Sequence, residues 1–162
     1  MIYSCAFWQD FALELPQGHE REHYANLVDF MTPIIKACCS EWGFRVCETA
    51  IQCLGGYGYC KDYPLEQYLR DVKILSLYEG TNGIQAMDLV GRKVLMDKFK
   101  QLNVFTGEML SFACQFLPCK KSPQAKQMRK QAGTVAKLAI KWRYLAYRMA
   151  MRAKKNPDNV GA

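Results

Sequence analysis

The sequence lacks the features of several common protein classes. Six prolines and eleven glycines among 162 residues are too few for a linker-rich or collagen-like chain. No uncharged apolar run approaches the roughly 20 residues that span a bilayer, and residues 1–11 lack the basic stretch of a signal peptide. No alternating pattern predicts a strand, and no repeat is present. These absences predict a globular, cytoplasmic protein without a membrane span.

Paired metal ligands are also missing. The eight cysteines form no CxxC pair, and His19 and His23, the two histidines, stand far from any group of cysteines. Zinc sites need paired ligands at short spacing, so we predict no metal site. In a reducing cytoplasm the cysteines are expected to be free and mostly buried thiols. They are Cys5, Cys38, Cys39, Cys47, Cys53, Cys60, Cys114 and Cys119.

Charge is divided unevenly along the chain, whose formal net charge is +7. Residues 1–119 hold 10 basic and 14 acidic residues, whereas residues 120–162 hold 12 basic residues and one acidic residue, Asp158. The sequence therefore predicts a mildly acidic body followed by a strongly basic tail.

An apolar stripe in the tail predicts an amphipathic helix with a cationic face. The stripe consists of Val135, Leu138, Ala139, Trp142, Leu145, Ala146 and Met149. Three interpretations stay open: packing against the body with the lysines in water, contact of residues 126–155 with a membrane surface, or binding to an acidic partner. Nucleic acid is the least favoured partner, because no recognised binding fold accompanies the charge.

Helical spacing predicts an all-α protein, most simply an antiparallel, up-and-down bundle of four or more helices. Pro33 is expected to kink or split the second helix, and Asn82 and Gln85 have the spacing of a capping box. The predicted helices cover about 3–15, 20–54, a stretch from Pro64, 82–100, 108–117 and 123–155, with a connection at 101–107. We predict two parts, residues 1–102 and 103–162, both cut from a longer chain.

Three segments could carry chemistry. The glycines in 52–59 follow a helix and leave little side-chain bulk, so another molecule could come close, although the residue pattern alone favours a plain helix end followed by a turn. Glu79 lies just before a helix N-terminus, where free N–H groups can bind an anion and a carboxylate can act as a general base. The plainer interpretation is a solvated glutamate. Arg70 and Asp71, in 68–71, are interpreted as structural.

Taken together, the segments 51–59, 63–71 and 78–81 resemble the C-terminal domain of the FAD-dependent acyl-CoA dehydrogenases, in order and in spacing. The resemblance covers about residues 30–100, and the tail only faintly resembles the C-terminal extension of longer bacterial members. Members of this family combine an N-terminal helical domain, a β-domain and a C-terminal helical bundle. They oxidise an acyl-CoA thioester to the trans-2-enoyl-CoA by removing the α-proton and transferring a hydride from the β-carbon to the flavin.

The resemblance implies roles for particular residues. Glu79 would be the catalytic base, and its own N–H would bind the thioester carbonyl. Tyr78 and Gly80 would border the acyl and thioester groups. The implied FAD contacts are Gln52, Gly55, Gly56, Thr81, Asn82 and Gly83, of which the first three would face the FAD held mainly by the dimer-related subunit.

The resemblance also implies partners: an acyl-CoA substrate, a homodimer or homotetramer, and an electron-transfer flavoprotein as electron acceptor. A chain of 162 residues leaves no room for the other two domains, so we expect the fragment alone to be inactive. Two alternatives remain. One is a non-catalytic helical module for oligomerisation or interaction, and the other is a membrane-surface adaptor built on the basic helix.

Overall fold

A computed structural model of the chain describes residues 2–116 and 123–155, and every regular element in these ranges is helical. The all-α prediction is therefore confirmed. The elements are α1 (Ile2–Glu14), α2 (His19–Leu54), η1 (Gly55–Tyr59), α3 (Leu65–Lys73), η2 (Ile74–Ser76), α4 (Asn82–Met87), η3 (Asp88–Met96), α5 (Lys100–Phe116) and α6 (Pro123–Lys155).

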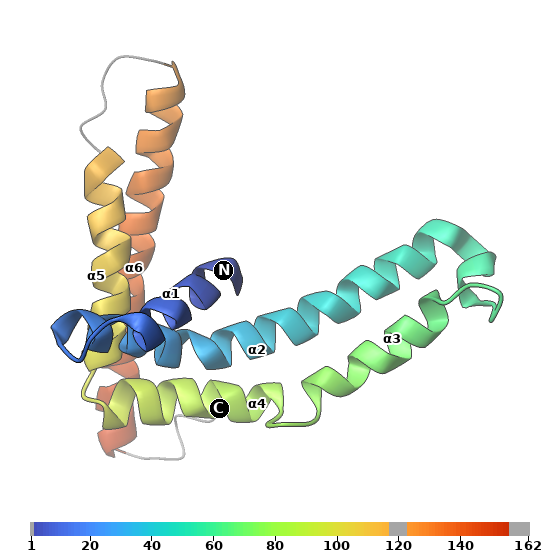
Figure 1. The fold of residues 1–162 in the computed structure, drawn as a ribbon, viewed down its shortest axis with the longest axis horizontal. Coiled ribbons are helices and arrows are strands. Elements are labelled where there is room, and N and C mark those ends of the chain that lie inside the picture. The colour runs from blue at the N-terminus through green and yellow to red at the C-terminus, as the bar shows by residue number, and fades with distance from the viewer. Residues whose placement is uncertain (1, 117–122, 156–162) are drawn as a thin grey trace.

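The long helix α2 organises the molecule (Figure 1). Helices α3 and α4 run back along it, and α5 and α6 form an antiparallel hairpin that crosses the N-terminal end of α2. Helix α1 lies against α2 at the same end, where the rings of Phe11 and Tyr24 stack with centroids 5.0 Å apart. The hairpin and the α2–α4 layer thus meet at one end of the molecule and diverge from there.

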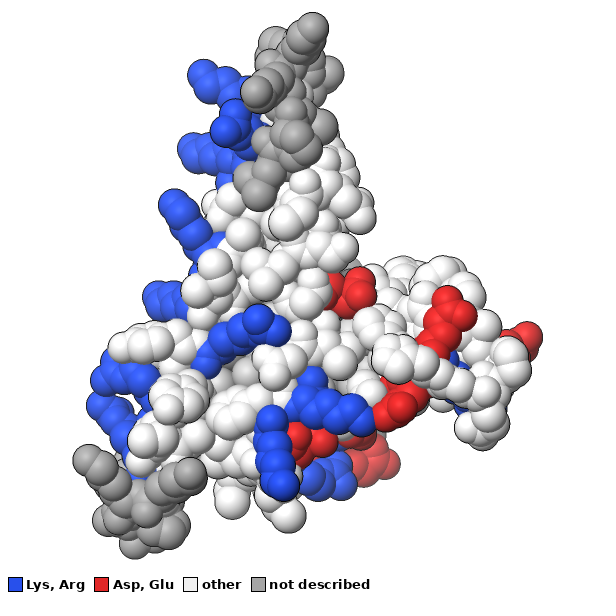
Figure 2. All heavy atoms as spheres, turned by 90° about the vertical axis from the view of Figure 1, so that its left-hand side faces the viewer, with Lys and Arg blue, Asp and Glu red and all other residues white. Residues whose placement is uncertain are grey.

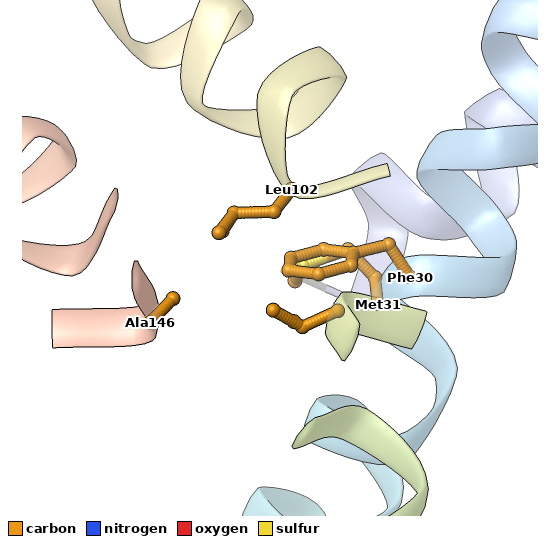
Figure 3. Packing of buried hydrophobic residues seen from close by; sticks show 5 residues of the cluster. Phe30, Met31, Leu102 and Ala146 are labelled. Carbon is orange, nitrogen blue, oxygen red and sulfur yellow. The ribbon is translucent and has the colours of Figure 1, made fainter. Parts of the chain in front are cut away.

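The buried core lies where these helices meet, and we call it the joint. Its buried side chains come from α2, η3, α5 and α6, and Figure 3 shows them converging. Beside them, the rings of Phe30, Phe105 and Trp142 lie with centroids 5.4–5.7 Å apart, a separation typical of favourable aromatic contact. The buried residues of the joint are Phe30, Met31, Val94, Leu102 and Ala146.

A charged network is built into the joint. Lys93 is only 3% exposed, and its Nζ pairs with the carboxylate of Asp29, which also accepts a 2.7 Å hydrogen bond from Gln101 Nε2. Burial raises the pKa of Asp29, but the hydrogen bonds from Lys93 and Gln101 and the charges of Lys93 and Arg92 outweigh it and hold this pKa below its ordinary value. The network ties α2, η3 and α5 together.

Pro33 does not split α2, as the sequence had suggested it could. Helix α2 runs unbroken from His19 to Leu54 with Pro33 inside it. Proline removes one helical hydrogen bond, but Pro33 is buried together with Phe30 and Met31, whose packing in the joint compensates for that loss.

The predicted connection at residues 101–107 is wrong, because α5 already begins at Lys100. Asn103, Thr106 and Gly107 are poor helix formers, which is why the local sequence favours a loop. Tertiary contacts override this preference. Thr106 is fully buried, its hydroxyl donates to the carbonyl of Leu102 at 2.6 Å, and it accepts a 2.7 Å hydrogen bond from Arg143 of α6.

The helix predicted at 82–100 is present, but its N-cap residue and its helix type differ from the prediction. Thr81 is the N-cap, and its hydroxyl accepts a 3.3 Å hydrogen bond from the N–H of Ile84, so the capping box predicted from Asn82 does not form. From Asp88 to Met96 the chain is π-helical, a form that sequence spacing does not reveal. Lys98 and Phe99, both with positive φ, end this stretch before α5.

Helix α6 packs on its own chain, against α5 and the joint. Ala132, Ala139 and Ala146 are buried at intervals of seven residues, and their small side chains let the two helices approach closely. Two members of the predicted apolar stripe, Leu138 and Leu145, are instead 53% and 42% exposed. The predicted boundary between residues 102 and 103 falls in the first turns of α5, and the division into two parts stays a prediction.

The cysteines are free, as predicted, but less buried than predicted. Cys53, Cys60 and Cys114 are exposed and four others are half-buried, while Cys119 lies outside the described residues. Within the described ranges, no group of side chains has the composition of a metal site. In the same ranges, no helix has both the length and the hydropathy that crossing a membrane requires.

Candidate active site

Every site residue that the sequence predicts lies on one extension of the molecule, which we call the arm. The arm consists of residues 41–87: the C-terminal half of α2, followed by η1, α3, η2 and α4 (Figure 1). No residue of α3, η2 or α4 is buried. Large apolar side chains are exposed along the arm, among them Trp42, Val46, Tyr57, Tyr59, Tyr68, Ile74, Leu77, Ile84 and Met87.

The loop that carries Glu79 has an unusual backbone. Glu79 has a φ of 55° and Gly80 a φ of 87°, so two successive residues adopt positive φ, which is uncommon for a side chain such as glutamate. Glu79 is exposed, and no ion pair or hydrogen bond engages its carboxylate in the part of the chain that the structure describes. Its N–H likewise has no acceptor among those residues, whereas the N–H of Tyr78 donates to Ile74. Glu79 thus offers an acid–base group and a hydrogen-bond donor to an incoming molecule.

Three side chains hold this loop in place. The ammonium of Lys36, on α2, donates to the carbonyl of Gly80. Gln85 Nε2 donates to the carbonyl of Glu79 at 3.4 Å, and the hydroxyl of Ser40 donates to Asn82 Oδ1 at 3.0 Å. Sequence reasoning missed Lys36 and Ser40, which lie about 40 residues from the loop. The one available signal is that Lys36 is the sole basic residue between Arg21 and Arg45.

The glycine-rich turn after α2 contains glycines with two different roles. Gly55 has a φ of 59° and ends the helix, its N–H donating to the carbonyl of Gln52. A Cβ placed on Gly55 or Gly56 would meet nothing within 4 Å, whereas one on Gly58 would lie 2.6 Å from the carbonyl oxygen of Ile51. Gly58 is therefore needed for packing, while Gly55 and Gly56 form an open, uncrowded surface.

The structure does not bring the six predicted cofactor residues into one group. Asn82 contacts Ser40, and Gln52 lies twelve residues further along α2, which is about 18 Å at the helical rise per residue. Gln52, Gly55 and Gly56 are therefore placed at the outer end of the arm, and Thr81, Asn82 and Gly83 at the start of α4, nearer the joint. The two groups can contact one and the same flavin only if that flavin is bound in an extended form. Otherwise they contact two different flavins.

The chemistry of these residues fits a flavin cofactor at both places. Gln52, Gly55 and Gly56 are exposed, and a bare glycine surface lets a cofactor approach the backbone. Thr81 and Gly83 are also exposed at the start of α4. The side chain of Asn82 fits less well, because its Oδ1 faces Ser40 on α2.

Residues in and next to the segment 63–71 make contacts that stabilise the arm. Arg70 pairs with Glu66 one turn earlier in α3, with Nη2 and Oε2 2.6 Å apart, so this ion pair lies within one helix. A Cβ on Gly43 would lie 3.2 Å from Cγ1 of Val72, so glycine permits the close contact between α2 and α3. This packing sets the distance between the two sides of the arm.

Residues 12–95, about half of the chain, match the family model described as "Acyl-CoA dehydrogenase, C-terminal domain". The chain belongs to the acyl-CoA dehydrogenase family. The match includes all three segments that carried the resemblance in the sequence, and it begins about 18 residues earlier than the sequence predicted.

Several curated acyl-CoA dehydrogenases are similar to this chain. A butyryl-CoA dehydrogenase of Syntrophomonas wolfei is 37% identical over 76% of the chain and 20% of its own length. A broad-specificity linear acyl-CoA dehydrogenase of Mycobacterium tuberculosis is 38% identical over 68% of the chain and 18% of its own. A 3-methylmercaptopropionyl-CoA dehydrogenase of Ruegeria pomeroyi is 39% identical over 56% and 15%, respectively. The chain therefore spans about a fifth of the length of its first relatives.

Proposed function

We propose that this chain is the C-terminal helical part of an FAD-dependent acyl-CoA dehydrogenase and supplies the catalytic base, Glu79. The observation that carries the proposal is the loop itself: an exposed carboxylate without a partner among the described residues, on a residue with positive φ, beside its own free N–H. Membership of the family supports the reaction class, and the relatives' names support a CoA thioester as substrate.

The proposed roles follow from what each group can do. The carboxylate of Glu79 takes the α-proton of the thioester, and the electron pair left on the α-carbon forms the double bond as the β-hydrogen leaves as hydride. The N–H of Glu79 donates to the thioester carbonyl, where negative charge develops in the transition state. Tyr78 and Gly80 border the bound thioester. Lys36 and Gln85 hold the loop carbonyls so that this arrangement exists before substrate binds.

FAD, when bound, supplies the acceptor for the hydride. We propose that Thr81, Asn82 and Gly83 contact it from the start of α4, and that Gln52, Gly55 and Gly56 contact the FAD of a second subunit. The separation of these groups along α2 supports contacts with two different flavins. The exposed apolar side chains of the arm support a homodimer or homotetramer in which a second copy covers them.

The wider context is proposed from the family. The protein would act in fatty acid β-oxidation in the cytoplasm and pass electrons to an electron-transfer flavoprotein. The chain alone would be inactive, because the arm lacks a buried core and the matched part of the chain spans only about a fifth of the length of the relatives.

The decisive experiment places the chain in a complete enzyme, for example a hybrid in which it replaces the matching C-terminal part of the S. wolfei relative. We expect Glu79→Gln to lower kcat for dehydrogenation by about 10²–10⁴-fold, the usual contribution of a general base. The flavin absorbance should be retained, and Glu66→Gln, on α3, serves as the matched control. Unchanged turnover in Glu79→Gln would exclude the proposed role and favour a non-catalytic helical module.

A further inference from the structure

The outer face of α6 carries a regular row of positive charge. Its residues are separated alternately by four and seven positions, a spacing that keeps them on one side of a helix, opposite the buried alanines. All six are exposed, and Figure 2 shows basic side chains in a row along the hairpin. This row, which we call the basic strip, consists of Lys126, Lys130, Lys137, Lys141, Arg148 and Arg152.

Nothing within the described chain neutralises the basic strip. No acidic residue occurs between Glu108 and Asp158 in the sequence. Across residues 2–116 and 123–155, no carboxylate forms an ion pair with any member of the strip, whereas Arg45, Arg70 and Arg92 each pair with an acidic residue one turn away. Six adjacent like charges repel one another, so the strip lowers the stability of α6 unless an anionic partner faces it.

Apolar side chains line both edges of the strip. On one edge Ile140, Tyr144 and Tyr147 are 58–60% exposed, and on the other Leu138 is 53% exposed. Arg148 lies over the ring of Tyr144, 5.7 Å from its centroid. Exposed aliphatic and tyrosine side chains next to lysines suit the boundary between lipid headgroups and acyl chains, where the apolar parts insert and the amines stay in water.

We propose that the outer face of α6 binds the surface of a membrane that contains anionic lipids, with the basic strip on the headgroups and Ile140, Tyr144 and Leu138 inserted beside it. The strip extends about 40 Å from Lys126 to Arg152, which suits a flat, extended surface. An open hollow between Lys126, Lys130 and Lys137, lined also by Gly133, can receive a headgroup phosphate. The aliphatic side chains at the edges of the strip would bury no apolar surface against the phosphate backbone of a nucleic acid. They therefore favour a lipid surface over a nucleic acid as the partner.

The membrane-binding face and the proposed catalytic loop lie on different parts of the molecule. The strip belongs to the hairpin and the loop to the arm, and these two parts extend from the joint in different directions (Figure 1). Membrane binding therefore does not depend on the proposed dehydrogenase reaction, and each can fail without the other.

The test is co-sedimentation of the full 162-residue chain with vesicles of phosphatidylcholine alone or mixed with phosphatidylglycerol. We expect binding to the mixed vesicles to be at least tenfold tighter, and to weaken as salt rises from about 0.1 M to about 1 M, because the Debye length shortens from about 10 Å to about 3 Å. Replacing Lys130, Lys137 and Lys141 together with glutamine should weaken binding about 100-fold, at roughly fivefold per charge near the surface.

Two controls keep the test specific. The triple variant Lys61→Gln, Arg70→Gln and Lys73→Gln removes the same net charge from the arm and should change binding by no more than about twofold. Replacing the three α6 lysines with arginine should restore binding, and circular dichroism checks that each variant remains helical.

The apolar edge is tested separately. Ile140→Ser should weaken vesicle binding about tenfold, chiefly the part that survives high salt, because less apolar surface is inserted. Equal binding to neutral and anionic vesicles, or equal losses in the arm and α6 triple variants, would overturn the proposal. Tighter binding to duplex DNA than to vesicles, unaffected by Ile140→Ser, would also overturn it and assign the strip to nucleic acid.

Discussion

The joint and the arm are both built from helices, but they differ in how much apolar surface they bury. In the joint, side chains from four elements are buried together and a lysine is held by carboxylate and amide partners. In the arm, α3, η2 and α4 bury no side chain completely, and large apolar groups face outward. The joint is thus stabilised by the chain itself, whereas the arm has surfaces that suit contact with other molecules. All predicted site residues lie on the arm.

The difference shows where stability and function separate in this molecule. Hydrophobic burial in the joint fixes the orientation of α2. Because the C-terminal half of α2 is part of the arm, the same burial also fixes the direction of the arm. The loop around Glu79 is then positioned by a few polar contacts from α2 rather than by a core. Substitutions in the joint should change folding, and substitutions in the loop should change activity.

The largest effect is expected at the centre of the joint. Phe30 is fully buried, and its ring touches those of Phe105 and Trp142. Phe30→Ala should lower the free energy of unfolding by about 4 kcal/mol, the usual cost of truncating a buried aromatic residue. Urea unfolding followed by circular dichroism measures it. A loss below about 1 kcal/mol would show that the joint is not the main source of stability.

The charged network should contribute the next largest effect. Asp29→Asn leaves Lys93 buried without its main anionic partner. The cost should be about 2 kcal/mol near neutral pH, less than for a fully buried pair, because the Asp29 side chain is 51% exposed and water screens the interaction. Because the folded-state pKa of Asp29 is lowered, its contribution is complete above the ordinary aspartate pKa and is lost as pH falls through the folded-state value.

The difference between wild type and Asp29→Asn should therefore shrink in acid. Unfolding titrations at neutral pH and in steps down to about pH 3 follow this change. Asp97→Asn, whose carboxylate accepts a 2.8 Å hydrogen bond from the N–H of Gln101, is the comparison variant. A difference that grows towards low pH would contradict the assigned sign.

Two glycines in the turn after α2 separate the effect of a substitution on stability from its effect on cofactor contact. Gly58→Ala places a Cβ against the backbone of Ile51 and should cost about 2 kcal/mol, whereas Gly56→Ala meets open space and should leave unfolding within about 0.5 kcal/mol of wild type. In the assembled enzyme, Gly56→Ala should still weaken flavin retention. Equal stability losses in the two variants would contradict the distinction between a packing and a contact glycine.

The smallest expected effect concerns the position of the loop. Lys36→Met removes the donor to Gly80 and should lower kcat about tenfold, with little change in Tm, because the contact fixes the loop rather than the core. Lys36→Arg should restore part of the activity. Kinetics and thermal unfolding of both variants in the assembled enzyme provide the measurement. A large fall in Tm with unchanged kcat would make Lys36 a stability residue only.

The sequence predicted much of the helical content and the motif positions, and its errors have physical causes. Asn103 and Gly107 disfavour helix, so the local sequence favours a loop at 101–107, and the burial of Thr106 against α6 reverses this preference. The π-helical stretch and the positive φ of Glu79 leave no periodic signal in the sequence. Glu79 itself could be predicted from its motif, whereas Lys36 and Ser40 could not.

The most direct test of the central claim isolates the proton step. In an assembled enzyme incubated with a saturated acyl-CoA in D2O, exchange of the substrate α-hydrogen reports proton removal without requiring complete turnover. Exchange should be readily measurable in wild type and should slow at least about 100-fold in Glu79→Gln, with flavin still bound. Exchange at the wild-type rate in that variant would contradict the assignment of Glu79 as the base.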